Sequence, residues 1–71
     1  MTGRILWWDQ RDGIGIIKGN DGLEYYADIS VLVPRELSST IKSGSRVEFI
    51  LNEKIKDCRC ATDVRPFNEE N

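Results

Sequence analysis

The sequence contains no histidine, and this absence removes the side chain that most often serves as a general base or a metal ligand. Its only cysteines are Cys58 and Cys60, too few without histidine for a closed zinc site. No nucleophile paired with a base and no phosphate-cradling loop is visible. Asp9, Asp12 and Asp28 are better explained by turn chemistry than by catalysis. We therefore expect a protein that is not an enzyme and that uses no metal or other cofactor.

The two cysteines lie two residues apart. On a strand they would project from the same face, in a geometry poorly suited to a mutual disulfide. One interpretation treats them as small strand residues in a reducing cytosol, and the other as a redox-sensing pair.

Long apolar runs and an excess of positive charge are also missing. No apolar run approaches the roughly 18 residues that cross a bilayer, and Met1–Leu6 lacks a signal peptide's long apolar region. We therefore expect a cytoplasmic protein with no membrane partner. Ten Lys and Arg stand against 12 Asp and Glu, a net charge of −2 that is atypical of a duplex-DNA binder. A chain of 71 residues holds one domain with a small core and no deep cleft for a small-molecule substrate.

Five short stretches have the apolar and β-branched composition of strands. They are Arg4–Trp8, Ile14–Lys18, Leu23–Ile29, Arg46–Leu51 and Cys58–Val64, the last stopped by Pro66. Residues 9–13 and 19–22 are rich in turn formers, and residues 52–57 form a charged hairpin loop. Between residues 30 and 45 we expect a long loop with one helical turn, which begins at Pro34 and has Glu36 near its positive end.

This order predicts an all-β fold, a five-stranded antiparallel Greek-key barrel with a long loop between its third and fourth strands. The barrel would occupy residues 1–66, and residues 67–71 would form a short acidic tail with frayed ends. The core follows if six apolar side chains point inward: Ile5, Ile17, Val47, Phe49, Ala61 and Val64.

The second stretch places two isoleucines on one face. Side chains alternate along a strand, so Ile14, Ile16 and Lys18 share one face, while Gly15 and Ile17 share the other. If Ile17 is inside, both remaining isoleucines face solvent and form an apolar patch with Tyr26. Such patches often mark interfaces, and base contact and protein contact are equally compatible with this one.

Five segments together resemble the cold-shock domain. They are Gly3–Asp9, Asp12–Ile17, Glu24–Ser30, Gly44–Phe49 and Ala61–Val64, in the family's order and spacing. The resemblance covers nearly the whole chain. It implies an oligonucleotide-binding (OB) barrel that binds single-stranded RNA or DNA on its second and third strands. Bases would stack there on exposed aromatic rings.

Carried over by position, Trp7 matches the family's stacking tryptophan, Trp8 the aromatic that follows it, and Tyr26 a third-strand phenylalanine. Isoleucines at 14 and 16 replace two phenylalanines, and Asp28 replaces a histidine. Since isoleucine has no π-face, the loss of several stacking partners at ~1–3 kcal/mol each would lower affinity by several powers of ten. Asp28 would add negative charge near a phosphate path.

The resemblance and simple alternation disagree about Trp7. Alternation places its side chain inside with Ile5, whereas the resemblance places it outside, which requires a bulge or twist in the strand.

Our leading prediction is weak binding of single-stranded RNA or DNA. The expected nucleic-acid-binding residues are Trp7, Trp8, Lys18, Tyr26, Ile14, Ile16, Arg4 and Asp28. Within this set the aromatic rings stack, the isoleucines give apolar contact, and Arg4 and Lys18 meet phosphates. The alternative is a protein–protein interaction module that uses the same apolar face to bind a partner or a second copy.

Overall fold

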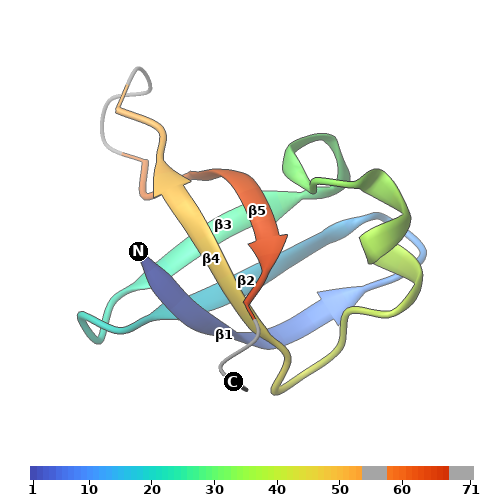
Figure 1. Ribbon diagram of the computed structural model, residues 1–71, viewed down its shortest axis with the longest axis horizontal. Coiled ribbons are helices and arrows are strands. Elements are labelled where there is room, and N and C mark those ends of the chain that lie inside the picture. Colours follow the sequence, from blue (N-terminus) through green and yellow to red (C-terminus); the bar gives the residue numbers. More distant parts are fainter. Residues whose placement is uncertain (54–57, 68–71) are drawn as a thin grey trace.

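The computed structural model describes residues 1–53 and 58–67, and within them five antiparallel strands form one curled, half-barrel sheet (Figure 1). The strands are β1 (Thr2–Asp9), β2 (Ile14–Gly19), β3 (Glu24–Asp28), β4 (Arg46–Leu51) and β5 (Ala61–Pro66). Their order across the sheet is β3-β2-β1-β4-β5. The predicted all-β architecture is confirmed at this level.

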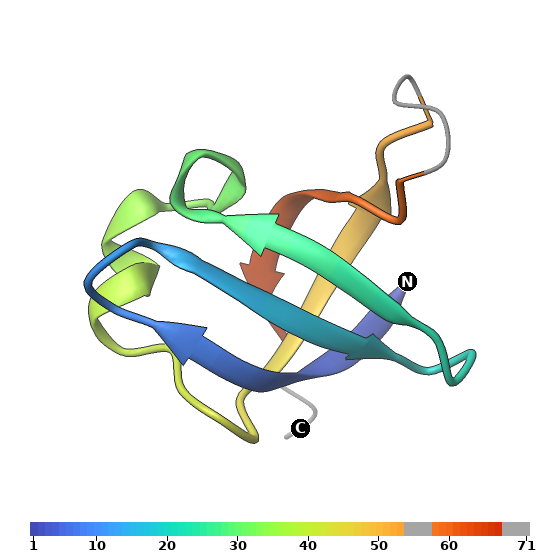
Figure 2. The ribbon, with the colours of Figure 1, turned by 180° about the vertical axis from the view of Figure 1, so that it is seen from behind.

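The curl brings the two ends of this strand order together. The backbone N–H of Tyr26, on β3, donates to the carbonyl of Arg59 at 2.7 Å, and Tyr26 forms an isolated parallel bridge with Cys60. A second bridge joins Leu32 to Val64. Figure 2 shows the consequence: β1, β2 and β3 lie in front of β4 and β5. Both groups of strands contribute buried side chains to the core.

Two 3₁₀ helices lie between β3 and β4: η1 (Ile29–Val31) and η2 (Arg35–Ser39). The second is the expected helical turn, since Pro34 stands directly before it and Glu36 lies in its first turn. The first was not expected. Asp28 ends β3 and caps η1, because its Oδ1 accepts from the backbone N–H of Ser30 at 3.0 Å.

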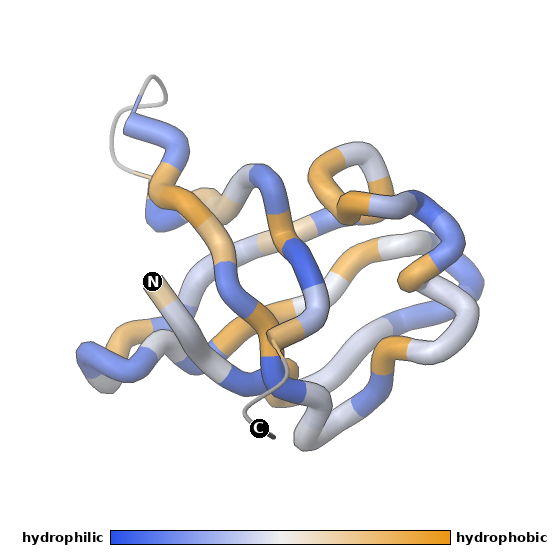
Figure 3. Tube along the Cα trace, in the orientation of Figure 1, coloured by the Kyte–Doolittle hydropathy of each residue, from blue (hydrophilic) through white to orange (hydrophobic). Residues whose placement is uncertain are grey.

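The core contains all six residues that the sequence predicts: Ile5, Ile17, Val47, Phe49, Ala61 and Val64. The curled sheet and the helical connection add Tyr25, Ala27, Leu32 and Ile41. Figure 3 shows how hydrophilic and hydrophobic residues alternate at the start of β4, which turns one face of this strand to the core.

The fifth strand corrects the prediction about the cysteines. It begins at Ala61, so neither Cys58 nor Cys60 lies in a regular strand, and the two form a disulfide. The expectation that they are poorly placed for one is wrong. Two residues of extended chain span about 6.6 Å, whereas these Cα atoms are 5.4 Å apart, within the range that a disulfide bridges. Local compression of the chain before β5 makes the bond feasible.

Other expected features meet the structure only in part. Strand β5 includes Pro66 as its last residue. Phe67 is half-buried, and its backbone N–H donates to the carbonyl of Arg46 at 3.0 Å. Residues 54–57 of the expected hairpin loop and 68–71 of the expected tail lie outside the described residues. Within the described part of the chain, no helix is long and apolar enough to cross a membrane.

Candidate nucleic-acid interface

A bulge in β1 turns Trp7 toward solvent. Ile5 pairs with Ile17, but the next paired residue is Trp7, opposite Ile16, so Leu6 is the extra residue. The bulge puts two consecutive side chains on the outer face: Leu6 is 39% exposed and Trp7 is 47% exposed. The expected outward position of Trp7 is confirmed, and so is the bulge that this position requires.

The segment before β4 holds the bulge in place. The β1–β4 ladder covers only Thr2–Arg4, and beyond it residues 43–45 take over the hydrogen bonds of β1. Ser43 donates its hydroxyl to the Leu6 carbonyl at 2.8 Å, and the backbone N–H of Gly44 donates to the Ile5 carbonyl at 2.7 Å. The carbonyl groups at the irregular point of β1 are therefore satisfied, which allows the bulge to persist.

Three strands contribute one residue each to an apolar row, defined as Trp7, Ile16 and Tyr26. The strand register places Ile16 directly between the other two. Tyr26 is 41% exposed, while Ile16 is partly covered by its neighbours. Ile14 is also partly exposed, so neither isoleucine is sealed in the core, as strand alternation predicts. The row presents two aromatic faces separated by an aliphatic side chain.

Trp8 lies on the other side of β1. It packs against the hydrophobic core and its Nε1 is buried with no hydrogen-bond partner in the described residues. Its opposite residue on β2 is Gly15. The sequence predicts Trp8 as a binding residue, but in the structure it packs against the core, supports the sheet and is not a member of the apolar row.

A second row, the cation row, runs beside the apolar row and consists of Arg46, Arg4 and Lys18. Arg4 is directly opposite Lys18 on one side and Arg46 on the other, and all three are exposed. Arg46 was not among the expected site residues. Alternation along the fourth strand puts it outside, but the pairing of that strand with the first is a property of the tertiary fold.

A third row lies on the far side of the apolar row and consists of Asp9, Ile14 and Asp28. We call it the acidic row. The Asp9 carboxylate accepts from the backbone N–H groups of Arg11 and Asp12, at 2.9 and 3.1 Å. Both carboxylates therefore have local roles, Asp9 in the β1–β2 turn and Asp28 as the cap of η1. Among the described residues no group of three His, Cys, Asp or Glu could hold a metal ion.

No protein-family model matches this chain, and no curated protein matches it.

Proposed function

We propose that this protein binds single-stranded RNA or DNA on the outer face of β1, β2 and β3, as a divergent barrel of the cold-shock type. The observation that carries the proposal is the apolar row: Trp7 and Tyr26 are both solvent-facing and lie in one register row on either side of Ile16. Unpaired bases stack on such rings in a way that tolerates any sequence. Bases of a duplex are not available for this contact.

The number of rings sets the expected strength of binding. Each base–ring stack contributes ~1–3 kcal/mol, so two rings supply about 2–6 kcal/mol before other contacts are counted. Ile16 adds apolar contact but no stacking, because it has no π-face. Arg4 and Lys18 supply phosphate contacts despite the net charge of −2. We therefore expect weak, salt-sensitive binding.

Fluorescence titration tests the proposal. Mixed-sequence single-stranded oligonucleotides are added at low salt, where phosphate attraction is strongest, and tryptophan emission is followed. Quenching that saturates in the wild type and disappears in Trp7→Leu supports binding at the apolar row, since Trp8 remains in that variant as an internal reporter. No quenching at ~100 μM oligonucleotide would reject the proposal.

Self-association is a second candidate function, and a separate observation supports it. Leu6, next to Trp7 at the β1 bulge, is 39% exposed, and this aliphatic side chain enlarges the apolar surface without adding a ring. This composition also suits self-association through the same face. Sedimentation equilibrium distinguishes the two: a dimer that Ile16→Lys dissociates supports self-association, and a monomer at every concentration measured excludes it.

A further inference from the structure

We propose that the bound single strand crosses β4, β1 and β2 with its phosphates along the cation row, and that Arg46 on β4 is a further nucleic-acid-contacting residue. This inference rests on the proposed function and extends its surface beyond β1, β2 and β3.

The first argument is electrostatic. Arg4 has a cation directly across from it on both neighbouring strands, and like charges at opposite positions destabilise a sheet. Within residues 1–53 and 58–67, neither Arg4 nor Lys18 forms an ion pair. The nearest acidic positions flank the row: Glu24 is opposite Lys18, and Glu48 lies opposite Thr2 with Arg65 on its other side. A polyanion over the row would relieve this repulsion.

The second argument is geometric. Neighbouring strands lie about 5 Å apart, so the three cations span about 10 Å across the sheet. The apolar row runs parallel to them, two residues further along β2, a step of about 7 Å from Lys18 to Ile16. A single strand that crosses the strands of the sheet can therefore place bases on one row and phosphates on the other. The acidic row, on the other side of the apolar row, repels phosphates. The sugar–phosphate backbone of the bound strand therefore lies on the side of the cation row.

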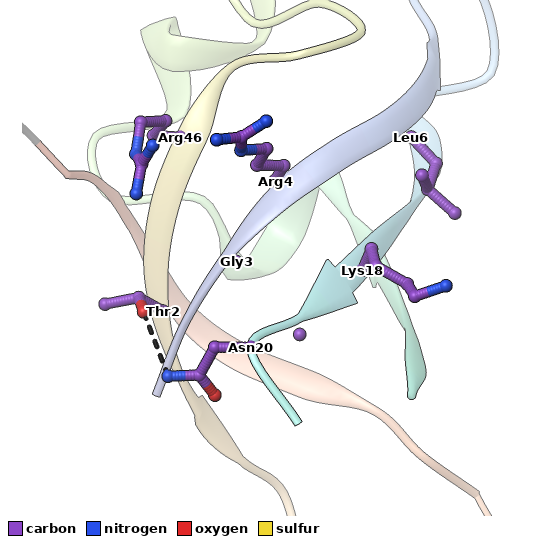
Figure 4. Close-up of a pocket in the computed structure, with 8 residues that line it drawn as sticks. Thr2, Gly3, Arg4, Leu6, Lys18, Asn20 and Arg46 are labelled. Atoms are coloured by element: carbon purple, nitrogen blue, oxygen red, sulfur yellow. Dashed lines mark hydrogen bonds between the residues drawn. The ribbon is translucent and has the colours of Figure 1, made fainter. Parts of the chain in front are cut away.

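The surface between the cations supports an extended ligand. A hollow of about 290 Å³ is lined by all three cations together with Leu6, Thr2 and Asn20. Figure 4 shows the Arg4 guanidinium directed toward Arg46, while the Lys18 side chain extends on the other side of β1, near Leu6. The two guanidinium groups lie on one side of β1 and the Lys18 ammonium on the other, so the three positive charges do not converge on one point. This arrangement suits successive phosphates of a chain better than a single small anion.

Salt dependence of binding tests the inference. Each phosphate neutralised on a single strand contributes about −0.7 to the slope of log K against log salt, so three contacts give a slope of about −2. We expect Arg46→Gln to reduce the magnitude of the slope by about 0.7. Arg46→Lys should retain the wild-type slope, because an ammonium still neutralises a phosphate. Arg65→Gln on β5 is the matched control: it removes the same charge outside the row and should leave the slope unchanged.

The outcomes separate this inference from the proposed function. If the wild type binds no single strand, the proposed function fails. If it binds and Arg46→Gln keeps the wild-type slope, or if Arg65→Gln lowers it equally, only the role of Arg46 is overturned. A polyglutamate peptide that competes as strongly as the oligonucleotide would overturn the phosphate path, because the row would then recognise negative charge of any kind. Urea denaturation of each variant verifies that the fold is retained.

Discussion

Trp8 on β1 lies directly against Gly15 on β2, and this pair has no room for a side chain at the glycine. A methyl group on Gly15 would stand 2.5 Å from Cε3 of Trp8 and 2.5 Å from the carbonyl oxygen of Trp7. The carbonyl belongs to the backbone and cannot move without disturbing the strand. The close approach of β1 and β2 beneath the apolar row therefore depends on this glycine.

The first prediction follows from this contact. Gly15→Ala should lower the free energy of unfolding by about 1–3 kcal/mol, the usual cost of overpacking. Urea denaturation followed by tryptophan fluorescence measures it. Gly22→Ala is a useful comparison, because nothing lies within 4 Å of that position and only its φ of +87° opposes a side chain. A Gly15→Ala midpoint at or above the wild-type value would contradict the packing described here.

The second prediction concerns the middle of the apolar row. Ile16→Phe would place a third ring between Trp7 and Tyr26, and binding of single strands should tighten by about 1–3 kcal/mol. The same substitution at Ile50, which is 56% exposed on β4 and outside the three rows, is the matched control and should not tighten binding. Equal affinities for Ile16→Phe and Ile50→Phe would mean that bases do not stack at the row.

The third prediction separates folding from binding at Arg4. Arg4→Gln removes two like-charge pairs, so the free energy of unfolding should rise by ~0.2–1 kcal/mol at low salt. The gain should shrink at high salt, because exposed charges are then screened. Arg4→Lys keeps the charge and should show no gain. Oligonucleotide affinity should fall in Arg4→Gln while stability rises. A less stable Arg4→Gln at low salt would count against the repulsion that the cation row implies.

The fourth prediction concerns pH and a hydrogen bond away from the three rows. The Tyr25 hydroxyl donates to the Asp21 carboxylate, which lowers the pKa of Asp21 below its ordinary 3.8 and raises the pKa of Tyr25 above its ordinary 10.0. The Asp21 contribution to stability is present above pH 3.8 and is lost as the pH falls through the lowered pKa. The Tyr25 contribution is present below pH 10.0 and is lost as the pH rises through the raised pKa.

Tyr25→Phe tests the loss of stability expected at low pH and the loss expected at high pH. The variant keeps the ring that packs on Phe49 at a centroid distance of 5.2 Å but loses the hydroxyl. It should be less stable than the wild type at neutral pH, and the two should converge in strong acid and in strong base. Tyr26→Phe, at an exposed hydroxyl, should track the wild type throughout. A stability difference for Tyr25→Phe that is constant across the pH range would show that this hydrogen bond does not set the two pKa values.

The alternating pattern predicted the inner and outer faces of β2 and of the start of β4, but it placed Trp7 inside, whereas the β1 bulge turns Trp7 outward. Ile5, Ile17, Val47 and Phe49 are buried as expected, because successive side chains on a strand point to opposite faces whatever the strand pairs with. The predicted start of the last strand at Cys58 is wrong. Cys58 and Cys60 have strand-like neighbours but lie in a compressed segment before β5. The sequence does not predict helix η1, because its cap, Asp28, is equally compatible with the end of a strand.

The sequence by itself determined which residues face outward on β2 and β4, since that alternation is a local property of an extended chain. Only the tertiary structure decided that Arg46 lies across from Arg4, and that residues 43–45 hold the β1 bulge that turns Trp7 to solvent. Register between strands far apart in the chain is set by long-range hydrogen bonds and by burial of the shared core. Neither can be predicted from the sequence of a single strand, so the cation row is identified only from the strand pairing in the structure.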